Sequence, residues 1–147
     1  NEVDALIIAK AGINRLNKDY SHLSLSPIPL SQILPSPGQG AIAIIYKKDN
    51  KICEEICKLI NDKTTENALL AERSLIKQIN GNCFTPIAAL AKVNKEKIVL
   101  QAKLFSKNGT IFSYKQLEGI ASDAKKIGLT CADYLINNLF NREKNEE

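Results

Sequence analysis

The amino-acid sequence predicts an α+β fold in which a helix, a three-stranded antiparallel sheet and a second helix form the C-terminal part of the chain. Three observations support this. Apolar residues recur at helical spacing over residues 64–80. Three runs of strand-forming residues, separated by short polar loops, follow between residues 85 and 119. Helical spacing then returns between residues 122 and 141, so that two helices can cover one sheet.

The composition is that of a soluble globular protein. The chain has 147 residues, enough for one ordinary domain or two small ones, with 44% hydrophobic and 24% charged residues. No apolar run approaches the roughly 20 residues of a membrane span, so we expect no membrane partner. The net charge of +4 is weak evidence for nucleic acid. The sequence has no methionine and starts directly in a strand-like segment, which leads us to expect a cut N-terminus.

The first part of the chain mixes short apolar runs with an irregular stretch. Residues 4–9 (DALIIA) form a short apolar run that predicts a buried strand. Residues 11–17 predict a helical turn that carries Arg15 close to the end of that strand. Residues 18–37 are rich in serine and proline and predict a loop or crossover.

Two elements are expected before the C-terminal unit. Residues 37–48 (PGQGAIAIIYKK) predict a glycine turn that leads into a strand over residues 41–47. Residues 49–61 predict a helix with one apolar face. That face contains Ile52, Ile56, Leu59 and Ile60.

The helix over residues 64–80 has candidate start and stop signals. Thr64 with Asn67, or Thr65 alone, can cap its first turn, and Gly81 can end it. Its apolar face contains Ala68, Ala71, Leu75 and Ile79.

The sheet and the last helix follow. Strands are predicted over residues 85–93, 97–106 and 110–119, with NKE and KNG as hairpin loops. The apolar positions of the last helix are Ala124, Ile127, Ala132, Leu135, Ile136 and Leu139.

The four cysteines predict reduced thiols rather than a disulfide framework, since no export signal is visible. Cys53 and Cys57 stand four residues apart on a predicted helix and could face a metal, but two more ligands are missing and His22 is far away. We therefore expect both thiols to pack beside the isoleucines of that helix. Cys131 is expected in the core of the last helix.

Cys83 is the unusual thiol, because it follows a helix end and lies in a turn (QINGNCFTP). The C-terminal end of a helix is negative and disfavours a thiolate, so Cys83 is not an obviously activated nucleophile. The turn gives it reach, which suits an anchor for a covalently held group. On these residues alone an incidental loop thiol is the simpler interpretation.

The sequence gives little support to a nucleotide-binding, RNA-binding or catalytic-triad site. The G-Q-G sequence at 38–40 precedes a predicted strand rather than a helix and lacks a following Gly-Lys-Ser/Thr, which argues against nucleotide binding. A turn whose backbone N–H groups approach another anionic ligand remains open. The predicted sheet shows no exposed aromatic pair or G-x-x-G clamp for RNA. His22 has no patterned partner for a Ser-His-Asp device.

The ordered segments DALIIAKAGINRL, LPSPGQGAIAI and AERSLIKQINGNCFTPIAALA, with the hairpin after them, resemble the porphobilinogen deaminase (hydroxymethylbilane synthase) family. The resemblance covers residues 4 to about 140. Its most specific parts are the cysteine followed by x-x-P-I-A and the P-G-Q-G-A turn.

The resemblance implies a transferase that condenses four porphobilinogen molecules into hydroxymethylbilane and releases ammonia. It works on a dipyrromethane primer, held by a thioether to the cysteine that matches Cys83. The family fold has three domains. Residues 1–37 match the end of the second α/β domain, residues 38–60 the segment that returns to the first, and residues 64–147 the C-terminal α+β cofactor-anchoring domain.

The resemblance also implies cofactor-binding residues. Arg15 matches an arginine that binds substrate carboxylates, to which a guanidinium can donate two parallel hydrogen bonds. Gln39, with Gly38 and Gly40, matches a turn that lines the cofactor cleft, and Ala9 matches a backbone contact. The family usually has glycine where this chain has Asn82, which tolerates left-handed backbone angles better than most residues.

No catalytic residue is expected in this chain. The family's catalytic aspartate lies in its N-terminal portion, and Asp4 and Glu72 are better interpreted as structural. We expect a cytoplasmic C-terminal portion of the enzyme that is inactive alone, binds no nucleic acid and either self-associates or pairs with its N-terminal part. The full-length enzyme is expected to be a monomer. The alternatives are a non-catalytic ligand-binding or interaction module of the same fold and, less favoured, a basic nucleic-acid binder.

Overall fold

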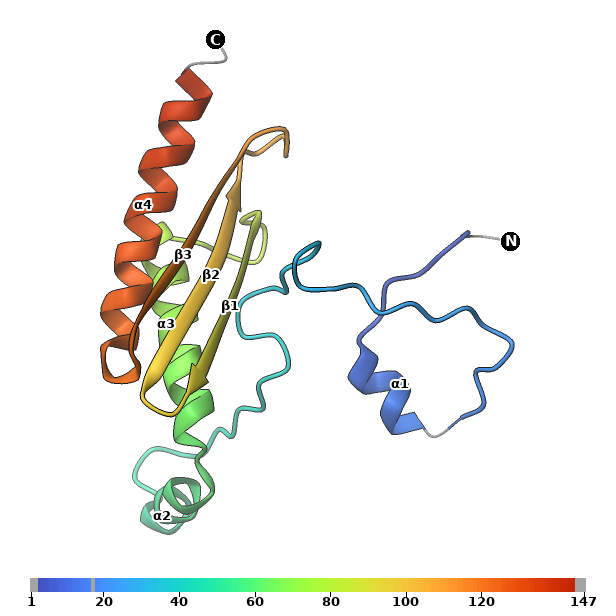
Figure 1. Cartoon of the computed structure of the whole chain (residues 1–147). Coiled ribbons are helices and arrows are strands. Elements are labelled where there is room, and N and C mark those ends of the chain that lie inside the picture. Colours follow the sequence, from blue (N-terminus) through green and yellow to red (C-terminus); the bar gives the residue numbers. More distant parts are fainter. Residues whose placement is uncertain (1–2, 17, 145–147) are drawn as a thin grey trace. The chain divides into compact units, whose positions relative to one another are not determined.

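The computed structural model of the protein describes residues 3–16 and 18–144. The chain divides into two compact units, Asn1–Ile33 and Leu34–Glu147 (Figure 1). Within the described ranges, no helix is long and apolar enough to cross a bilayer.

The described residues of the first unit contain one helix, α1 (Lys10–Leu16), as the sequence predicts for residues 11–16. Residue 17 lies outside the described residues. The strand predicted over residues 4–9 is wrong, because these residues form no regular structure and Leu6 and Ile7 are each 74% exposed. A strand exists only where a neighbouring strand takes up its backbone hydrogen bonds, and an apolar run alone does not supply one.

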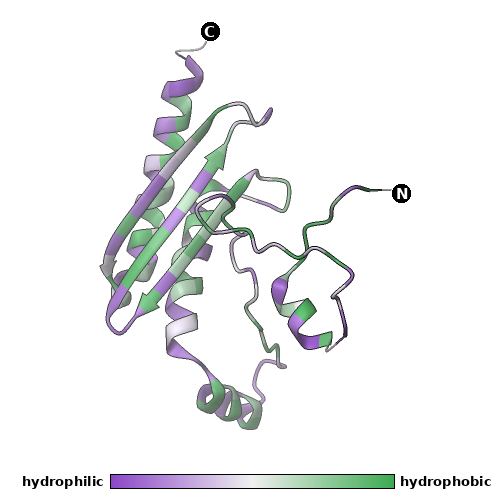
Figure 2. Cartoon of the chain, turned by 45° about the vertical axis from the view of Figure 1, so that its right-hand side comes forward, coloured by the Kyte–Doolittle hydropathy of each residue, from purple (hydrophilic) through white to green (hydrophobic). Residues whose placement is uncertain are grey.

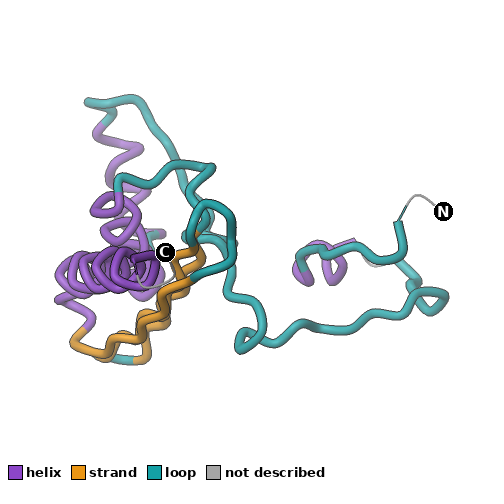
Figure 3. Tube along the Cα trace, turned by 90° about the horizontal axis from the view of Figure 1, so that it is seen from above, coloured by secondary structure: helices purple, strands orange, loops and turns teal. Residues whose placement is uncertain are grey.

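The second unit has two layers, a sheet and a pair of helices. The sheet has the order β1-β2-β3, and both neighbouring pairs are antiparallel. Helices α3 and α4 lie on one face of it (Figure 3). A short 3₁₀ turn, η1, links β3 to α4. The bounds are α3 Lys63–Ile79, β1 Ile87–Asn94, β2 Lys97–Phe105, β3 Phe112–Ile120, η1 Ala121–Asp123 and α4 Ala124–Lys144. The predicted helix–sheet–helix order is therefore confirmed.

The two hairpins occur where the sequence predicts them. Asn94 pairs with Lys97, which leaves a two-residue loop, and Lys95 in that loop has a φ of 55°. In the second hairpin Gly109 supplies the positive φ, at 77°. Left-handed backbone of this kind reverses a chain tightly, and glycine adopts it without strain.

The core lies between the sheet and the two helices and consists mainly of alanine and leucine. Ala71 and Leu75, on the predicted face of α3, have no exposed surface, and Ala68 and Ile79 are partly buried against them. Ile136, another apolar position of α4, lies outside this core and is 39% exposed. The buried apolar residues of this core are Ala71, Leu75, Ala89, Ala91, Ile98, Leu100, Ala102, Leu104, Ala121, Ala124, Ile127, Cys131, Ala132 and Leu135.

Cys131 is a core residue, as predicted, and burial raises the pKa of its thiol to about 11. Desolvation disfavours the charged thiolate, so this group stays neutral at physiological pH.

Helices α3 and α4 approach each other closely at Gly128. A Cβ atom at this position would overlap the carbonyl oxygen of Ala71 and lie 2.9 Å from Cβ of Ser74. A polar contact supports the same pairing, since Gln78 Nε2 donates a 2.8 Å hydrogen bond to Asp133 Oδ1. Glycine at position 128 therefore sets how near the two helices can come.

The face of the sheet away from the helices carries an aromatic pair that the sequence analysis does not expect. Phe112 and Tyr114 of β3 are 41% and 43% exposed and alternate with buried Ser113. The Nζ atom of Lys103 lies 5.4 Å from the centroid of the Phe112 ring. The expectation that this sheet lacks an exposed aromatic pair is therefore wrong.

Helix α2 (Lys51–Ile60) forms where the sequence predicts it, but none of its residues is buried, so its apolar face is largely exposed. Asn50 caps it by accepting a 3.1 Å hydrogen bond from the N–H of Cys53. Ile52 is 72% exposed and Ile56 51%, so the half-buried Cys53 and Cys57 do not pack in a core beside them as expected. The hydropathy colours show hydrophobic and hydrophilic residues mixed along this helix (Figure 2).

The segment 41–47, which precedes α2, is not a strand, contrary to the prediction. Ile42 is 84% exposed and Ile45 94%. The reason is the same as for residues 4–9, since no neighbouring strand pairs with this segment.

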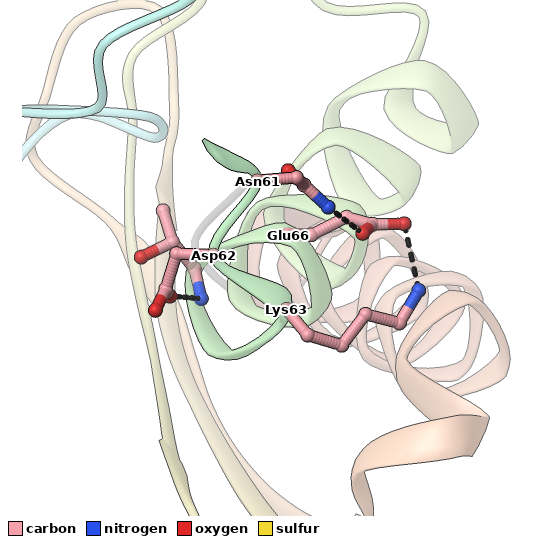
Figure 4. Close-up of polar contacts among 5 residues, drawn as sticks. Asn61, Asp62, Lys63 and Glu66 are labelled. Atoms are coloured by element: carbon pink, nitrogen blue, oxygen red, sulfur yellow. Dashed lines mark hydrogen bonds and ion pairs between the residues drawn. The ribbon is translucent and has the colours of Figure 1, made fainter. Parts of the chain in front are cut away.

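Helix α3 begins with a network of polar contacts (Figure 4). Asp62 is the cap, and its Oδ1 accepts a 2.6 Å hydrogen bond from the N–H of Thr65, so the predicted threonine caps are wrong. Glu66 accepts hydrogen bonds from Asn61 and Lys63 at 2.6 and 2.9 Å. The hydrogen bond from Thr65 lowers the pKa of Asp62, and that from Lys63 lowers the pKa of Glu66.

Candidate functional site

The C-terminal end of α3 leads into the turn that carries Cys83. Asn80, and not Gly81, adopts the left-handed conformation, with a φ of 59°. Its N–H donates to the carbonyl oxygen of Lys77, and the N–H of Gly81 donates to that of Ile76 at 2.9 Å. These two bonds form a Schellman motif, which satisfies carbonyl groups at the helix end and fixes the direction in which the chain leaves the helix.

Asn82 then organises the turn through its side chain. The N–H of Thr85 donates to the carbonyl oxygen of Asn82 at 3.0 Å, and the N–H of Asn82 donates to Thr85 Oγ1 at 2.9 Å. The side chain of Asn82 accepts a further bond from the N–H of Phe84 at 2.8 Å. Asn82 does not have a positive φ, so it supports the turn as a hydrogen-bond acceptor and not through left-handed angles.

Cys83 is the second residue of this turn and is exposed. A thioether needs a thiol that a carbon electrophile can reach, and Cys83 meets that condition on a loop fixed at both ends. Its neighbour Phe84, which no motif in the sequence indicates, is 94% exposed. Burial depends on how the turn faces the rest of the unit, so the local sequence carried no signal of it.

The glycine turn is the second part of the candidate site. Gly38 and Gly40 have φ values of 76° and 82°, which a residue with a Cβ atom adopts only with strain. The N–H of Gln39 donates to the carbonyl oxygen of Ser36, and that of Ala41 donates to Gly38. The side chain of Gln39 is exposed at the tip of this turn.

Glu72 fastens the glycine turn to the edge of the sheet. Its Oε2 accepts a 2.6 Å hydrogen bond from the N–H of Gly38, and its Oε1 accepts a 2.7 Å bond from the N–H of Ala91 in β1. One more bond joins the same two segments, from the N–H of Ala89 to the carbonyl oxygen of Pro35, at 3.0 Å. The anion beside this turn is thus the chain's own carboxylate, which was expected only to be structural.

The remaining two predicted site residues belong to the first unit. Ala9 accepts a 3.0 Å hydrogen bond from the N–H of Gly12, and Arg15 lies in the last turn of α1. Both are exposed. The structure therefore groups Cys83 with residues 38–40 in one unit, and Ala9 with Arg15 in the other.

An open apolar trough of about 730 Å³ lies elsewhere in the second unit, between the segment 40–44 and helices α2 and α3. Cys83 does not line it. Its residues are Gly40, Ala41, Ile42, Ala43, Ile44, Cys57, Ile60, Asn61, Asp62, Thr65, Glu66, Leu69, Leu70 and Arg73. No group of three or more histidine, cysteine, aspartate or glutamate residues within residues 3–16 and 18–144 could hold a metal ion.

Comparison with known proteins supplies the family. A model described as "Porphobilinogen deaminase, C-terminal domain" matches residues 66–137, and one described as "Porphobilinogen deaminase, dipyromethane cofactor binding domain" matches residues 1–55. The chain belongs to the porphobilinogen deaminase family. The resemblance in the sequence is thereby confirmed. Cys83 falls within the first match, and the other five predicted site residues fall within the second.

Individual relatives agree with the family models. The porphobilinogen deaminase of Clostridium novyi is 36% identical over 138 residues, which cover 91% of this chain and 45% of the relative. That of Orientia tsutsugamushi is 36% identical, over 95% of this chain and 47% of the relative. A probable porphobilinogen deaminase of Nitrosopumilus maritimus is 37% identical, over 98% and 47%. The chain thus spans just under half the length of these relatives.

Proposed function

We propose that this chain supplies the cofactor-anchoring part of a transferase that condenses four porphobilinogen molecules into hydroxymethylbilane with release of ammonia. One observation carries the proposal: Cys83 is an exposed thiol on a hydrogen-bonded turn, within the residues that match the C-terminal domain of the family, and we take it to be the anchor. Among the four cysteines only this one is exposed, since Cys53 and Cys57 are half-buried and Cys131 is buried.

The roles of the site residues follow from their chemistry. Cys83 would hold a dipyrromethane primer by a thioether, which supplies the carbon to which the first substrate unit is joined. Arg15 would pair with acetate or propionate carboxylates of the pyrroles, since its guanidinium can donate two parallel bonds to a carboxylate. Residues 38–40 and Ala9 would line the cleft with backbone groups and with the exposed amide of Gln39.

The domain assignment belongs to the same proposal. Residues 1–37 would complete a second α/β domain, residues 38–60 would return to a first, and residues 64–147 would form the C-terminal domain. The exposed apolar side chains of residues 41–47 and α2 support it, because these segments carry strand-like and amphipathic sequence that the described part of the chain leaves largely uncovered. The chain alone would be inactive, since the family's catalytic aspartate has no match here.

The compartment, the oligomeric state and the binding partners are proposed from the same family membership. We expect a cytoplasmic enzyme that is monomeric when complete and binds neither nucleic acid nor membrane. Without the rest of the enzyme, the uncovered apolar surface should make this chain self-associate or pair with the N-terminal part. A non-catalytic module of the same fold is the alternative.

The deciding experiment is intact-mass measurement of the complete protein, with and without Cys83→Ser. The proposal expects an adduct of two pyrrole units that the substitution removes, together with ammonia release from porphobilinogen. A complete protein with no adduct and no turnover would support the non-catalytic module. An adduct that persists in Cys83→Ser would refute the assignment of the anchor.

A further inference from the structure

We propose that Glu72 is the positioning residue of the glycine turn: its carboxylate fixes where Gln39 lies relative to β1, and through β1 relative to the turn of Cys83. The link to cofactor binding rests on the function proposed above. The link between the segments rests on geometry alone.

The geometry joins three segments at one side chain. Glu72 belongs to α3, Gly38 to the glycine turn and Ala91 to β1, and the two hydrogen bonds measure 2.6 and 2.7 Å. Glu72 is 5% exposed, and neither of the two ion pairs recorded among residues 3–16 and 18–144 includes it. A buried carboxylate without a cation is costly unless hydrogen bonds satisfy it, so the two N–H groups are what make this position tolerable.

Glutamate is suited to this position in a way that glutamine is not. The two backbone N–H groups converge on one side chain, and each needs an acceptor. A carboxylate offers two acceptor oxygens, whereas an amide offers one oxygen and turns its NH₂ group toward the other donor. Hydrogen bonds to a charged acceptor are also shorter and stronger than neutral ones. Substitution by glutamine therefore leaves one N–H group unpaired while it changes the volume little.

The same arrangement couples the two halves of the candidate site. Ala91 lies in the strand that begins at Ile87, just after the turn of Cys83, and α3 ends directly before that turn. Gln39 follows Gly38, whose N–H is held by the carboxylate. Glu72 thus connects the tip of one loop with the two elements that flank the other, although it touches neither Gln39 nor Cys83 by any recorded hydrogen bond among the described residues.

The first test is amide hydrogen exchange in this chain. In the unsubstituted chain the Gly38 amide should exchange at least tenfold more slowly than an unstructured peptide, although it lies in a surface turn. In Glu72→Gln, exchange at Gly38 or Ala91 should accelerate at least tenfold more than at the core residues Ile98 and Leu100. Glu66→Gln, on the same helix, is the matched control and should leave Gly38 and Ala91 unchanged.

Three results would overturn the inference: an unprotected Gly38 amide in the unsubstituted chain, no acceleration in Glu72→Gln, or equal acceleration throughout the unit. If Glu72→Gln does not fold, Glu72→Asp, whose carboxylate is one methylene shorter, is judged by the same criterion.

The second test uses the complete enzyme and a double-mutant cycle. Glu72→Gln should leave the mass of the adduct on Cys83 unchanged and lower kcat/KM at least fivefold. The double variant with Gln39→Ala should have a kcat/KM only slightly lower than that of Gln39→Ala alone, because both changes remove the effect of a correctly placed Gln39 side chain. A general loss of stability would instead add to the effect of Gln39→Ala, and additive effects overturn the inference. Absence of the adduct in the unsubstituted enzyme refutes the proposed function, and hydrogen exchange then decides the inference alone.

Discussion

The carboxylate of Glu72 accepts a 2.6 Å hydrogen bond from the N–H of Gly38 and a 2.7 Å hydrogen bond from the N–H of Ala91. One side chain therefore links the glycine turn to the edge strand of the sheet. The stability of the second unit should depend on it. In Glu72→Leu both N–H groups lose their acceptor; that of Ala91 is buried and that of Gly38 part-buried, and a buried unpaired donor costs about 1–3 kcal/mol. We therefore expect the free energy of unfolding in urea to fall by more than about 2 kcal/mol. The control Glu55→Ala, at an exposed position of α2, should stay within about 0.5 kcal/mol.

Cys83 should be the most reactive thiol and the least important for stability. It is exposed, whereas Cys131 is fully buried. Under native conditions an alkylating reagent should modify Cys83 first and Cys131 last, as peptide mass spectrometry would show. Cys83→Ala opens no core cavity and should change the free energy of unfolding by no more than about 0.5 kcal/mol. Faster modification of Cys131 than of Cys83 would contradict the placement of both residues.

The buried thiol of Cys131 should give the protein a stability loss at alkaline pH. Its pKa is raised from 9.0 to about 11, so between these values the folded state keeps a proton that the unfolded state releases. The stabilising contribution is complete below pH 9 and declines as the pH rises toward 11, by roughly 2 kcal/mol in total. Urea unfolding of the wild type and Cys131→Ala across this range should show a steeper decline in the wild type. Parallel curves would rule the effect out.

Gly128 should tolerate no side chain. Any Cβ atom there overlaps the carbonyl oxygen of Ala71, so Gly128→Ala must push α3 and α4 apart. Overpacking of this kind typically costs about 1–3 kcal/mol, which exceeds the gain of roughly 0.5–1 kcal/mol that alanine brings to a helix interior. The melting temperature should fall accordingly. Asn137→Ala, at an exposed position of the same helix, should not lower it. Equal melting temperatures for Gly128→Ala and the wild type would show that the helices are not in close contact there.

Asp62 should make the start of α3 sensitive to acid. The N–H of Thr65 lowers the pKa of Asp62, so its contribution is present above the ordinary value of 3.8 and is lost as the pH falls through the lowered value. Asp62→Asn keeps a capping acceptor without the charge, and its stability should decline less between about pH 5 and pH 2 than that of the wild type. Asp4→Asn, in the first unit, serves as a control and should follow the wild type. Indistinguishable acid unfolding of Asp62→Asn and the wild type would argue against the cap.

The sequence predicts those parts of the fold that depend on neighbours in the chain. The helix at Lys63–Ile79 and the two hairpins follow from periodicity and turn residues, which act over a few positions. The strands expected over residues 4–9 and 41–47 failed because pairing depends on a partner strand that no local pattern supplies. The helix end shows a finer limit, since Asn80 and Gly81 both suit a left-handed residue and the hydrogen bonds to Lys77 and Ile76 decide between them.

The candidate site likewise contains features that the local sequence predicts and features that depend on long-range contacts. Cys83 and the glycine turn could be found from short motifs. The bond of Glu72 to Gly38 spans 34 residues and that to Ala91 spans 19, so no local motif contains either pair. The sequence predicts that Asn82 suits the turn through its backbone angles, but its support comes from a hydrogen bond that its side-chain oxygen accepts from the N–H of Phe84.

The end of α3 also affects how readily the protein undergoes deamidation. Asparagine followed by glycine is the sequence in which deamidation is fastest, because the glycine nitrogen attacks the asparagine side chain to form a cyclic imide. Here the N–H of Gly81 is bound to the carbonyl oxygen of Ile76, and Asn80 is held in one conformation, so the attack is restrained while the helix end is intact. The extent to which Asn80 is converted to aspartate or isoaspartate should therefore increase with the frequency at which this helix end opens. Isoaspartate would add a backbone carbon three residues before Cys83 and displace its thiol permanently.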